Sequence, residues 1–213
     1  MVEAATSPLV AAIRHRSPFE GHQPVERPSR EGKIGVRLST GTINSVTRIA
    51  TWHHGIDALT AALGAAFGLA VPAKTGDVVH LPHGLLVRSG PEEFLLLSGQ
   101  RLDVWALRQK IAADTGSITD LSHARCLIHI EGERCRDTLS KLFALDLREQ
   151  EFPLDLVRLS GHHHVPAMLH RRERDAFDIH VFSTYAHDQL ATLIDAALEY
   201  GVALTLSHAN VVA

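Results

Sequence analysis

The pattern of apolar and polar positions predicts short strands interleaved with helices. Ile34, Val36 and Leu38 alternate with polar or small residues, which is typical of a half-buried strand. Apolar residues at 56, 59, 63 and 67 recur at helical spacing, which predicts a helix there. The same reasoning predicts strands over 46–52, 78–81, 85–88, 93–98, 118–121, 126–130, 156–160, 165–169, 177–181 and 202–206, and helices over 104–111, 135–142 and 185–200.

Two stretches of the chain have the same layout. Residues 85–97 and residues 167–181 each read as a strand, an acidic turn and a strand led by Phe, and a helix follows each of them. We therefore expect an α+β fold over residues 33–213, with two related, closely packed halves built from antiparallel sheets and flanking helices.

Residues 1–32 differ from the rest of the chain. Prolines stand at 18, 24 and 28, and a basic run covers 14–16. This composition opposes regular helix and predicts an extended or disordered N-terminal arm, with order beginning near Lys33. The arm is either disordered or laid over the surface of a partner.

Composition narrows the classes of function. The formal net charge is −3, so no broad basic field favours nucleic acid as a partner. The longest apolar stretch, 58–71, is too short to span a bilayer and contains two glycines. The N-terminus has no signal-peptide pattern, and Cys126 and Cys135 lack zinc or redox spacing. We expect a cytoplasmic protein with two buried thiols and no membrane contact.

The familiar cofactor motifs are absent from the sequence. It contains no G-x-G-x-x-G after a strand, no G-x-x-x-x-G-K-[ST] and no G-x-S-x-G. Asp120, Ser122 and His123 resemble a hydrolase triad in composition, but they stand too close in sequence to converge as one. Asp120 and Ser122 are instead expected to hydrogen-bond backbone in a turn. No catalytic or cofactor-binding residue is predicted in this chain.

Fifteen histidines make the chain unusual, and three of them are consecutive, at 162–164. On a strand only His162 and His164 would share a face, so a metal would need a third ligand from elsewhere. Solvated or partner-facing side chains, a metal site and a pH-sensitive interface all stay open. We assign no metal ligand and expect His162 and His164 to contact a partner.

A basic cluster follows in the next predicted hairpin. Arg171, Arg172 and Arg174 could grip a phosphate or a carboxylate, could be solvated, or could pair with the acidic residues of a partner. We expect these three arginines to be partner contacts.

Several segments together resemble a known family. They are 119–125 with the strand through Ile130, the helix ending at 142–147, the turn and strand at 90–97, and 164–172 followed by 176–178. This pattern resembles the folate-binding aminomethyltransferase superfamily, and within it the gamma subunits of heterotetrameric sarcosine oxidases. The resemblance runs from about residue 34 to about residue 206.

The resemblance implies an aminomethyltransferase folate-binding-domain-like fold and a complex with alpha, beta and delta subunits. In such complexes the other subunits hold FAD, FMN, NAD, tetrahydrofolate and zinc, and sarcosine is oxidised; the related N-methylglutamate dehydrogenases have similar subunits. Folate-binding members carry an acid in the region that matches residues 160–167, where this chain has no carboxylate. The resemblance therefore implies a non-catalytic gamma subunit that binds no cofactor itself.

Two other functions stay open at this point. One is a stand-alone folate-binding protein of the same superfamily, although neither cysteine stands in a reactive motif. The other is a metal-binding protein built on the histidines. Metal content after chelation distinguishes the second from a subunit of a complex.

Overall fold

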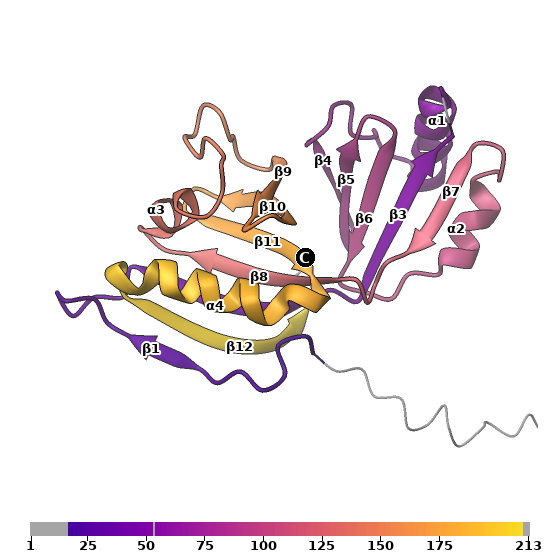
Figure 1. The fold of residues 1–213 in the computed structure, drawn as a ribbon. Helices are drawn as coiled ribbons and strands as arrows, with labels where there is room; N and C mark the ends of the chain where they lie inside the picture. Colours follow the sequence, from indigo (N-terminus) through magenta and orange to yellow (C-terminus); the bar gives the residue numbers. More distant parts are fainter. Residues whose placement is uncertain (1–16, 53, 211–213) are drawn as a thin grey trace, which may run out of the picture.

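The computed structural model describes residues 17–52 and 54–210, which fold into two sheets with two helices packed on each (Figure 1). The larger sheet has seven strands, and the smaller has five. In spatial order the larger contains β1 (Val25–Arg27), β12 (Val202–Asn210), β2 (Val36–Thr42), β8 (Arg125–Glu131), β11 (Ala176–Phe182), β10 (Val165–Glu173) and β9 (Val157–His162). The smaller contains β4 (Val78–Leu81), β5 (Gly84–Gly90), β6 (Glu93–Ser98), β3 (Ser45–Thr51) and β7 (Gly116–Asp120).

The strands pair antiparallel, except β12 with β2, which run parallel. The helices are α1 (Ile56–Phe67), α2 (Val104–Lys110), α3 (Cys135–Ser140) and α4 (Ala186–Ala197). Short 3₁₀ turns, Ser183–Tyr185 and Leu198–Tyr200, flank α4. The helix expected over 185–200 is therefore α4 with a 3₁₀ turn at each end.

Side-chain alternation divides the interior into layers. Phe177, Ile179 and Val181 of β11 face α3 and α4 and belong to the largest apolar cluster. A second cluster packs α1 and α2 on the smaller sheet. A third joins the two sheets, because it contains Leu85 from β5 and Met168 from β10. Each sheet is thus covered by helices on one face and meets the other sheet on its second face.

The two halves repeat the same topology, as the sequence predicted. The segment β3–α1–β4–β5–β6–α2–β7 corresponds to β8–α3–β9–β10–β11–α4–β12, and the strand orders β4-β5-β6-β3 and β9-β10-β11-β8 match. Both hairpins shift register at the same place, between Arg88 and Gly90 in β5 and between Arg171 and Glu173 in β10. The halves differ where β2 lies between β8 and β12, whereas β7 pairs directly with β3.

Ordered structure begins before the boundary expected near Lys33. β1 pairs with β12 through Val25 and Leu204, and Phe19 is only 4% exposed within the largest apolar cluster. The physical reason is that β12 would otherwise be an open sheet edge, and Phe19 gains a buried position beside it. The rest of the expected arm, residues 1–16, lies outside the described residues.

Two further expectations concern the thiols and the membrane. Cys126 and Cys135 are buried and unbridged, as predicted, and burial raises the pKa of each thiol to about 12. Within the described part of the chain, no helix has both the length and the apolar character needed to cross a membrane.

Candidate functional site

The predicted contact residues gather on the hairpin of β10 and β11 and on the turn that precedes it. Ala167, Leu169 and Arg171 alternate on the face of β10 that packs against the helices. Arg171 is therefore only 2% exposed, whereas Arg174 in the turn has 81% of its side chain exposed. The expectation that Arg171 contacts a partner is wrong, because its side chain lies inside the chain's own fold.

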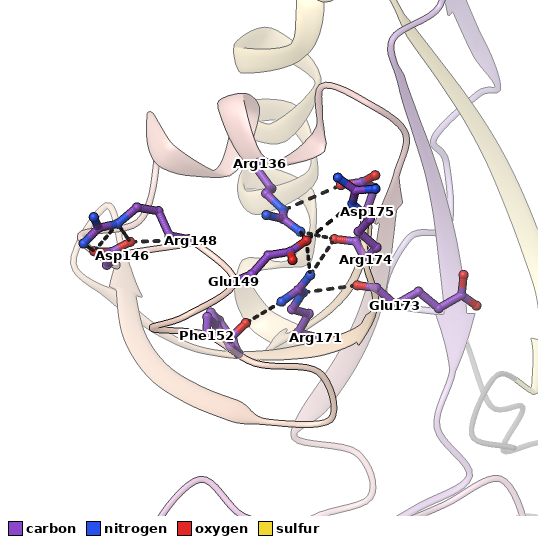
Figure 2. A network of polar contacts seen from close by, with 9 residues as sticks. All are labelled: Arg136, Asp146, Arg148, Glu149, Phe152, Arg171, Glu173, Arg174 and Asp175. Carbon is purple, nitrogen blue, oxygen red and sulfur yellow. Dashed lines mark hydrogen bonds and ion pairs between the residues drawn. The ribbon is translucent and has the colours of Figure 1, made fainter.

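Arg171 holds a network of polar contacts around Glu149 (Figure 2). Oε1 of Glu149 lies 3.1 Å from Nη2 of Arg136, 3.3 Å from Nη2 of Arg171 and 3.3 Å from Nε of Arg174. The hydrogen bond from Arg136 lowers the pKa of Glu149, and the charges of the other two arginines add to it. The carboxylate thus stays ionised and ties the loop after α3 to the hairpin.

The remaining donors of Arg171 reach backbone carbonyls. Nη1 donates to the carbonyl oxygen of Phe152 at 2.7 Å, and Nη2 donates to that of Arg174 at 3.2 Å (Figure 2). Nε donates to the carbonyl oxygen of Glu173 at 3.3 Å. A buried guanidinium group that is engaged by four contacts within the chain stabilises the fold and is enclosed away from a solvent-borne anion.

Arg172 points to the opposite face of the sheet from Arg171. Its Nη1 lies 3.4 Å from Oδ1 of Asp178, and Nδ1 of His129 donates to the same oxygen at 2.5 Å. Burial alone would raise the pKa of Asp178, but the hydrogen bond and charge of His129, with the charges of His180 and Arg172, lower it. Because 37% of the Arg172 side chain stays exposed, this arginine still reaches the surface.

The pair of His129 and Asp178 resembles the orienting half of a catalytic dyad. Catalysis would need Nε2 of His129 to face a substrate. That atom is buried without a hydrogen-bond partner, and a Cβ added at Gly41 would lie only 2.9 Å from it. Gly41 therefore covers Nε2, and the pair has no room for a reacting group.

Two other histidines, His80 and His170, share one carboxylate that joins the two halves of the chain. Asp155 accepts from Nε2 of His170 through Oδ1 at 3.0 Å, and Oδ2 lies 2.7 Å from Nε2 of His80. His80 lies on β4 of the smaller sheet and His170 on β10 of the larger. The carboxylate therefore bridges the sheets on the exposed side of the apolar cluster that joins them.

His180 lies on the same face of the larger sheet as Asp178, among the polar residues between the two sheets, and is only 1% exposed. Burial lowers its pKa to about 3, and neither ring nitrogen has a hydrogen-bond partner. Sequence reasoning missed the layer of His129, His170, Asp178 and His180. The alternation of Asp178 and His180 with apolar residues along β11 was the available signal, since it marks a polar second face.

The consecutive histidines do not form a shared site. His162 ends β9 and is fully buried, with its ring 5.2 Å from that of Phe143 and beside the amide of Gln189, and burial lowers its pKa. His163 and His164 are exposed and form a two-residue turn with φ of 47° and 67°. The expected partner contact by His162 is wrong because the core encloses it, while His164 stays available.

Metal ligation finds no support at this turn. His162 and His164 point into different surroundings, one enclosed and one exposed. Over the ranges that the structure describes, no group of three or more His, Cys, Asp or Glu side chains is arranged to hold a metal ion.

The turn at Asp120 follows the prediction. Oδ1 of Asp120 accepts from the backbone N–H of Ser122 at 2.9 Å and from its hydroxyl at 2.5 Å, which lowers the pKa of Asp120. The Ser122 oxygen in turn accepts from the backbone N–H of Val46 at 3.1 Å. These residues close a turn and fix it to β3, and they take no part in a triad.

Two surface clefts lie at the hairpin end of the larger sheet. One, of about 380 Å³, is lined by Arg37, Glu131, Arg174 and neighbouring residues. The other, of about 820 Å³, lies between residues 28–35 and Tyr200. Both carry acids and bases in similar number, so neither has the one-sided charge of an anion or cation site.

The sequence is similar to that of a named subunit of a known enzyme. No family model matches it. It is 30% identical over 147 residues to the sarcosine oxidase subunit gamma of Corynebacterium sp. (strain U-96), covering 67% of this chain and 71% of that one.

Solved structures share the fold. A chain of the heterotetrameric sarcosine oxidase from Corynebacterium sp. U-96, in complex with pyrrole 2-carboxylate, superposes with a TM-score of 0.73 at 23% identity, covering 87% of this chain and 96% of that one. Glycine cleavage system aminomethyltransferase T from Bartonella henselae gives a TM-score of 0.55 at 13% identity, covering 82% of this chain and 48% of that one.

Proposed function

The chain belongs to the gamma-subunit family of sarcosine oxidase, and on that premise we propose that it is the non-catalytic gamma-type subunit of a heterotetrameric enzyme that oxidises sarcosine or a related N-methyl amino acid. The observation that carries the proposal is the relationship to a gamma subunit over 147 residues. In this assembly the chain supplies surface, and the chemistry takes place on the other subunits.

The polar groups of the chain support a structural role. Arg171 is satisfied by carbonyls and by Glu149, and the buried His129 is turned toward Asp178 with its second nitrogen covered. A catalytic acid or base needs access to a substrate, which neither group has. We therefore propose that Arg171 and His129, with their carboxylate partners, stabilise the folded chain and do not take part in catalysis.

Tetrahydrofolate does not fit the residues at the matching position. Residues 160–167 form the end of β9, the two-histidine turn and the start of β10, and they contain no carboxylate. The nearby acids already have partners, Asp155 with His80 and His170, and Asp178 with His129. We propose that FAD, FMN, NAD, tetrahydrofolate and zinc lie on the alpha, beta and delta subunits.

The exposed residues of the hairpin and turn are the proposed contacts with those subunits. They are Arg172, Arg174 and His164, and the side chain of Arg174 is more exposed than that of Arg172. Arginine is enriched at protein interfaces, where its planar group can pair with carboxylates. We also propose a cytoplasmic location, which is supported by two buried cysteines without a disulfide bond.

Co-expression with the flavin-bearing subunits tests the proposal. A tag on this chain should capture those subunits together with their flavin absorbance through gel filtration. The chain alone should be colourless and should bind tetrahydrofolate more weakly than about 1 mM in calorimetry, which corresponds to about 4 kcal/mol. A chain that elutes alone from cells containing all subunits, or that carries flavin by itself, would overturn the proposal.

A further inference from the structure

The outer face of α1 carries almost no polar side chain. Leu59 and Leu63 pack into the apolar cluster of the smaller sheet, so the opposite side of the helix faces outward. The exposed positions of the helix are Asp57, Ala58, Ala61 and Ala65. Residues 58–73, which include most of α1 and the segment after it, contain no charged side chain. A helix that is apolar on both faces is typical of a buried position.

α4 provides a matched comparison within the same molecule. Both helices have 12 residues, and in both of them the second, third, sixth and tenth positions are exposed. On α4 these positions hold His187, Asp188, Ala191 and Asp195, so three of the four are polar. On α1 only the first of the four, Asp57, is polar. The same helical geometry therefore presents a polar face to water on α4 and a row of methyl groups on α1.

Helix propensity alone does not explain this row of alanines. Alanine is the best helix former, so an exposed helix can gain stability from it. However, Gly64 stands inside α1, where glycine costs about 1 kcal/mol relative to alanine. A Cβ added at Gly64 would meet its nearest neighbour at 3.6 Å, so alanine would fit there as well. The apolar surface also continues past the helix, because Leu69 is 43% exposed. These features match a surface that another chain covers.

The size of the exposed side chains points to a helix as the occupant. Ala58, Ala61 and Ala65 follow the spacing of one stripe along a helix. Helix axes pack about 8–10 Å apart according to the side chains between them, and methyl groups allow the shorter distances. A charged partner residue over this stripe would lose its hydration without gaining an ion pair. The occupant should therefore present an apolar face.

The stripe is too small to hold two copies of this chain together by itself. A helix of 12 residues is about 18 Å long, and a width of about 10 Å gives roughly 180 Å². A stable interface buries about 800 Å² on each partner. The stripe therefore suits a contact within a larger assembly, in which other surfaces of the chain supply the remaining area.

We propose that Ala58, Ala61 and Ala65 form a docking surface for an apolar helix of another subunit of the complex. This inference rests on the proposed function and names a surface separate from the hairpin of β10 and β11. α1 lies with the smaller sheet, away from α4 (Figure 1). Charged groups stand at both ends of the surface, namely Asp57 in the first turn and Lys110, whose Nζ donates to a carbonyl oxygen of the last turn at 3.3 Å.

Thiol protection tests the inference directly. Ala61→Cys and Ala191→Cys each place one reactive thiol on the chain, because Cys126 and Cys135 are buried and have pKa values of about 12. Each variant is treated with N-ethylmaleimide, alone and within the co-expressed complex, and mass spectrometry of this chain follows the labelling. Assembly should slow the labelling of Ala61→Cys by roughly tenfold or more, because the reagent cannot reach a covered thiol, and that of Ala191→Cys by less than about twofold.

A second measurement introduces a charge on the same stripe. Ala61→Lys should raise the dissociation constant of the chain for the rest of the complex by roughly tenfold or more, because the ammonium group loses its hydration there. Ala191→Lys, at the equivalent position of α4, should change this constant by less than about twofold. Lysine is a good helix former, and melting temperatures equal to that of the wild type confirm that both variants are folded.

The other outcomes overturn the assignment. If Ala61→Cys is labelled as fast in the complex as in the free chain, no subunit covers α1, and the proposed function still stands. Equal effects of Ala61→Lys and Ala191→Lys on the dissociation constant also overturn it. Labelling of Ala61→Cys that slows when the chain alone is concentrated shows that a second copy covers the stripe instead. If the wild-type chain forms no complex, the proposed function fails and this inference fails with it.

Discussion

Arg171 donates to Oε1 of Glu149 at 3.3 Å, and the two residues come from different structural contexts, a buried strand and a half-exposed loop. The contact fastens the segment between α3 and β9 to the hairpin of β10 and β11. Arg136 and Arg174 bind the same oxygen, but they are more exposed than Arg171. The buried arginine is therefore the centre of the network.

Replacing Arg171 by Met should lower the free energy of unfolding by roughly 2–4 kcal/mol, because the carbonyls of Phe152 and Glu173 lose a buried donor. Arg171→Lys should restore only part of the loss, since an ammonium group cannot reach several acceptors in one plane. Urea unfolding measures both. Arg174→Ala, which removes an exposed partner of Glu149, should cost less than about 1 kcal/mol. Equal losses at the two positions would contradict the central role of Arg171.

The buried His180 makes stability depend on pH in mild acid. Its folded pKa of about 3 lies below the ordinary value of 6.5, so between these values the unfolded chain binds a proton that the folded chain does not. Stability must then fall as pH drops from 6.5 toward 3. From pH 7 to pH 5 this group alone should remove about 2 kcal/mol. Burial of His162 lowers its pKa and acts in the same direction.

The variant His180→Gln isolates this contribution. Its stability curve should be flatter than that of the wild type between pH 7 and pH 5, and the two curves should run parallel above about pH 8, where the wild-type imidazole is neutral in both states. Chemical denaturation at each pH provides the values. Parallel curves throughout the acidic range would show that His180 is not held neutral by burial.

Phe19 should contribute to the folded core although it precedes the boundary expected from the sequence. Phe19→Ala should cost roughly 3 kcal/mol, because it removes a buried ring from the largest apolar cluster. Glu26→Ala on the exposed face of β1 is the matched control and should change stability by less than about 0.5 kcal/mol. Thermal unfolding of the three proteins decides. If both variants match the wild type, the segment before Lys33 makes no contribution to the folded core.

The turn of His163 and His164 should be strained, since both residues adopt positive φ. A two-residue hairpin of this kind favours Asn-Gly, so the double variant His163→Asn, His164→Gly should raise the free energy of unfolding by about 1 kcal/mol. If His164 contacts a partner, the same variant should assemble less well despite its greater stability. A drop in stability would show that the histidines make favourable contacts in the turn.

Local pattern predicted most of the fold. Strands and helices follow from apolar periodicity, and the paired hairpins of the two halves were visible as a repeated layout of strand, acidic turn and Phe-led strand. β1 was missed because it has three residues between prolines and carries no periodic signal. The position of β2 between β8 and β12 depends on long-range pairing that no local pattern encodes.

The candidate site was harder to predict. Arg171 stands among charged residues, which suggested a surface position, yet it shares the parity of Ala167 and Leu169 on β10, and this parity was the better guide. His162 was misjudged because its burial depends on the distant Phe143 and Gln189. The polar layer around Asp178 needed the order of β8, β11 and β10, which the sequence alone does not supply.

Native mass spectrometry of the co-expressed complex tests the central claim most directly. The chain should be present within an assembly that retains flavin, and gentle activation should release it as a flavin-free subunit of 23.3 kDa. The other subunits, released with the mass of their flavin still attached, serve as the internal control. The proposed role as a non-catalytic subunit is contradicted if the chain is found only outside the assembly, or if the released 23.3 kDa subunit carries the added mass of a flavin.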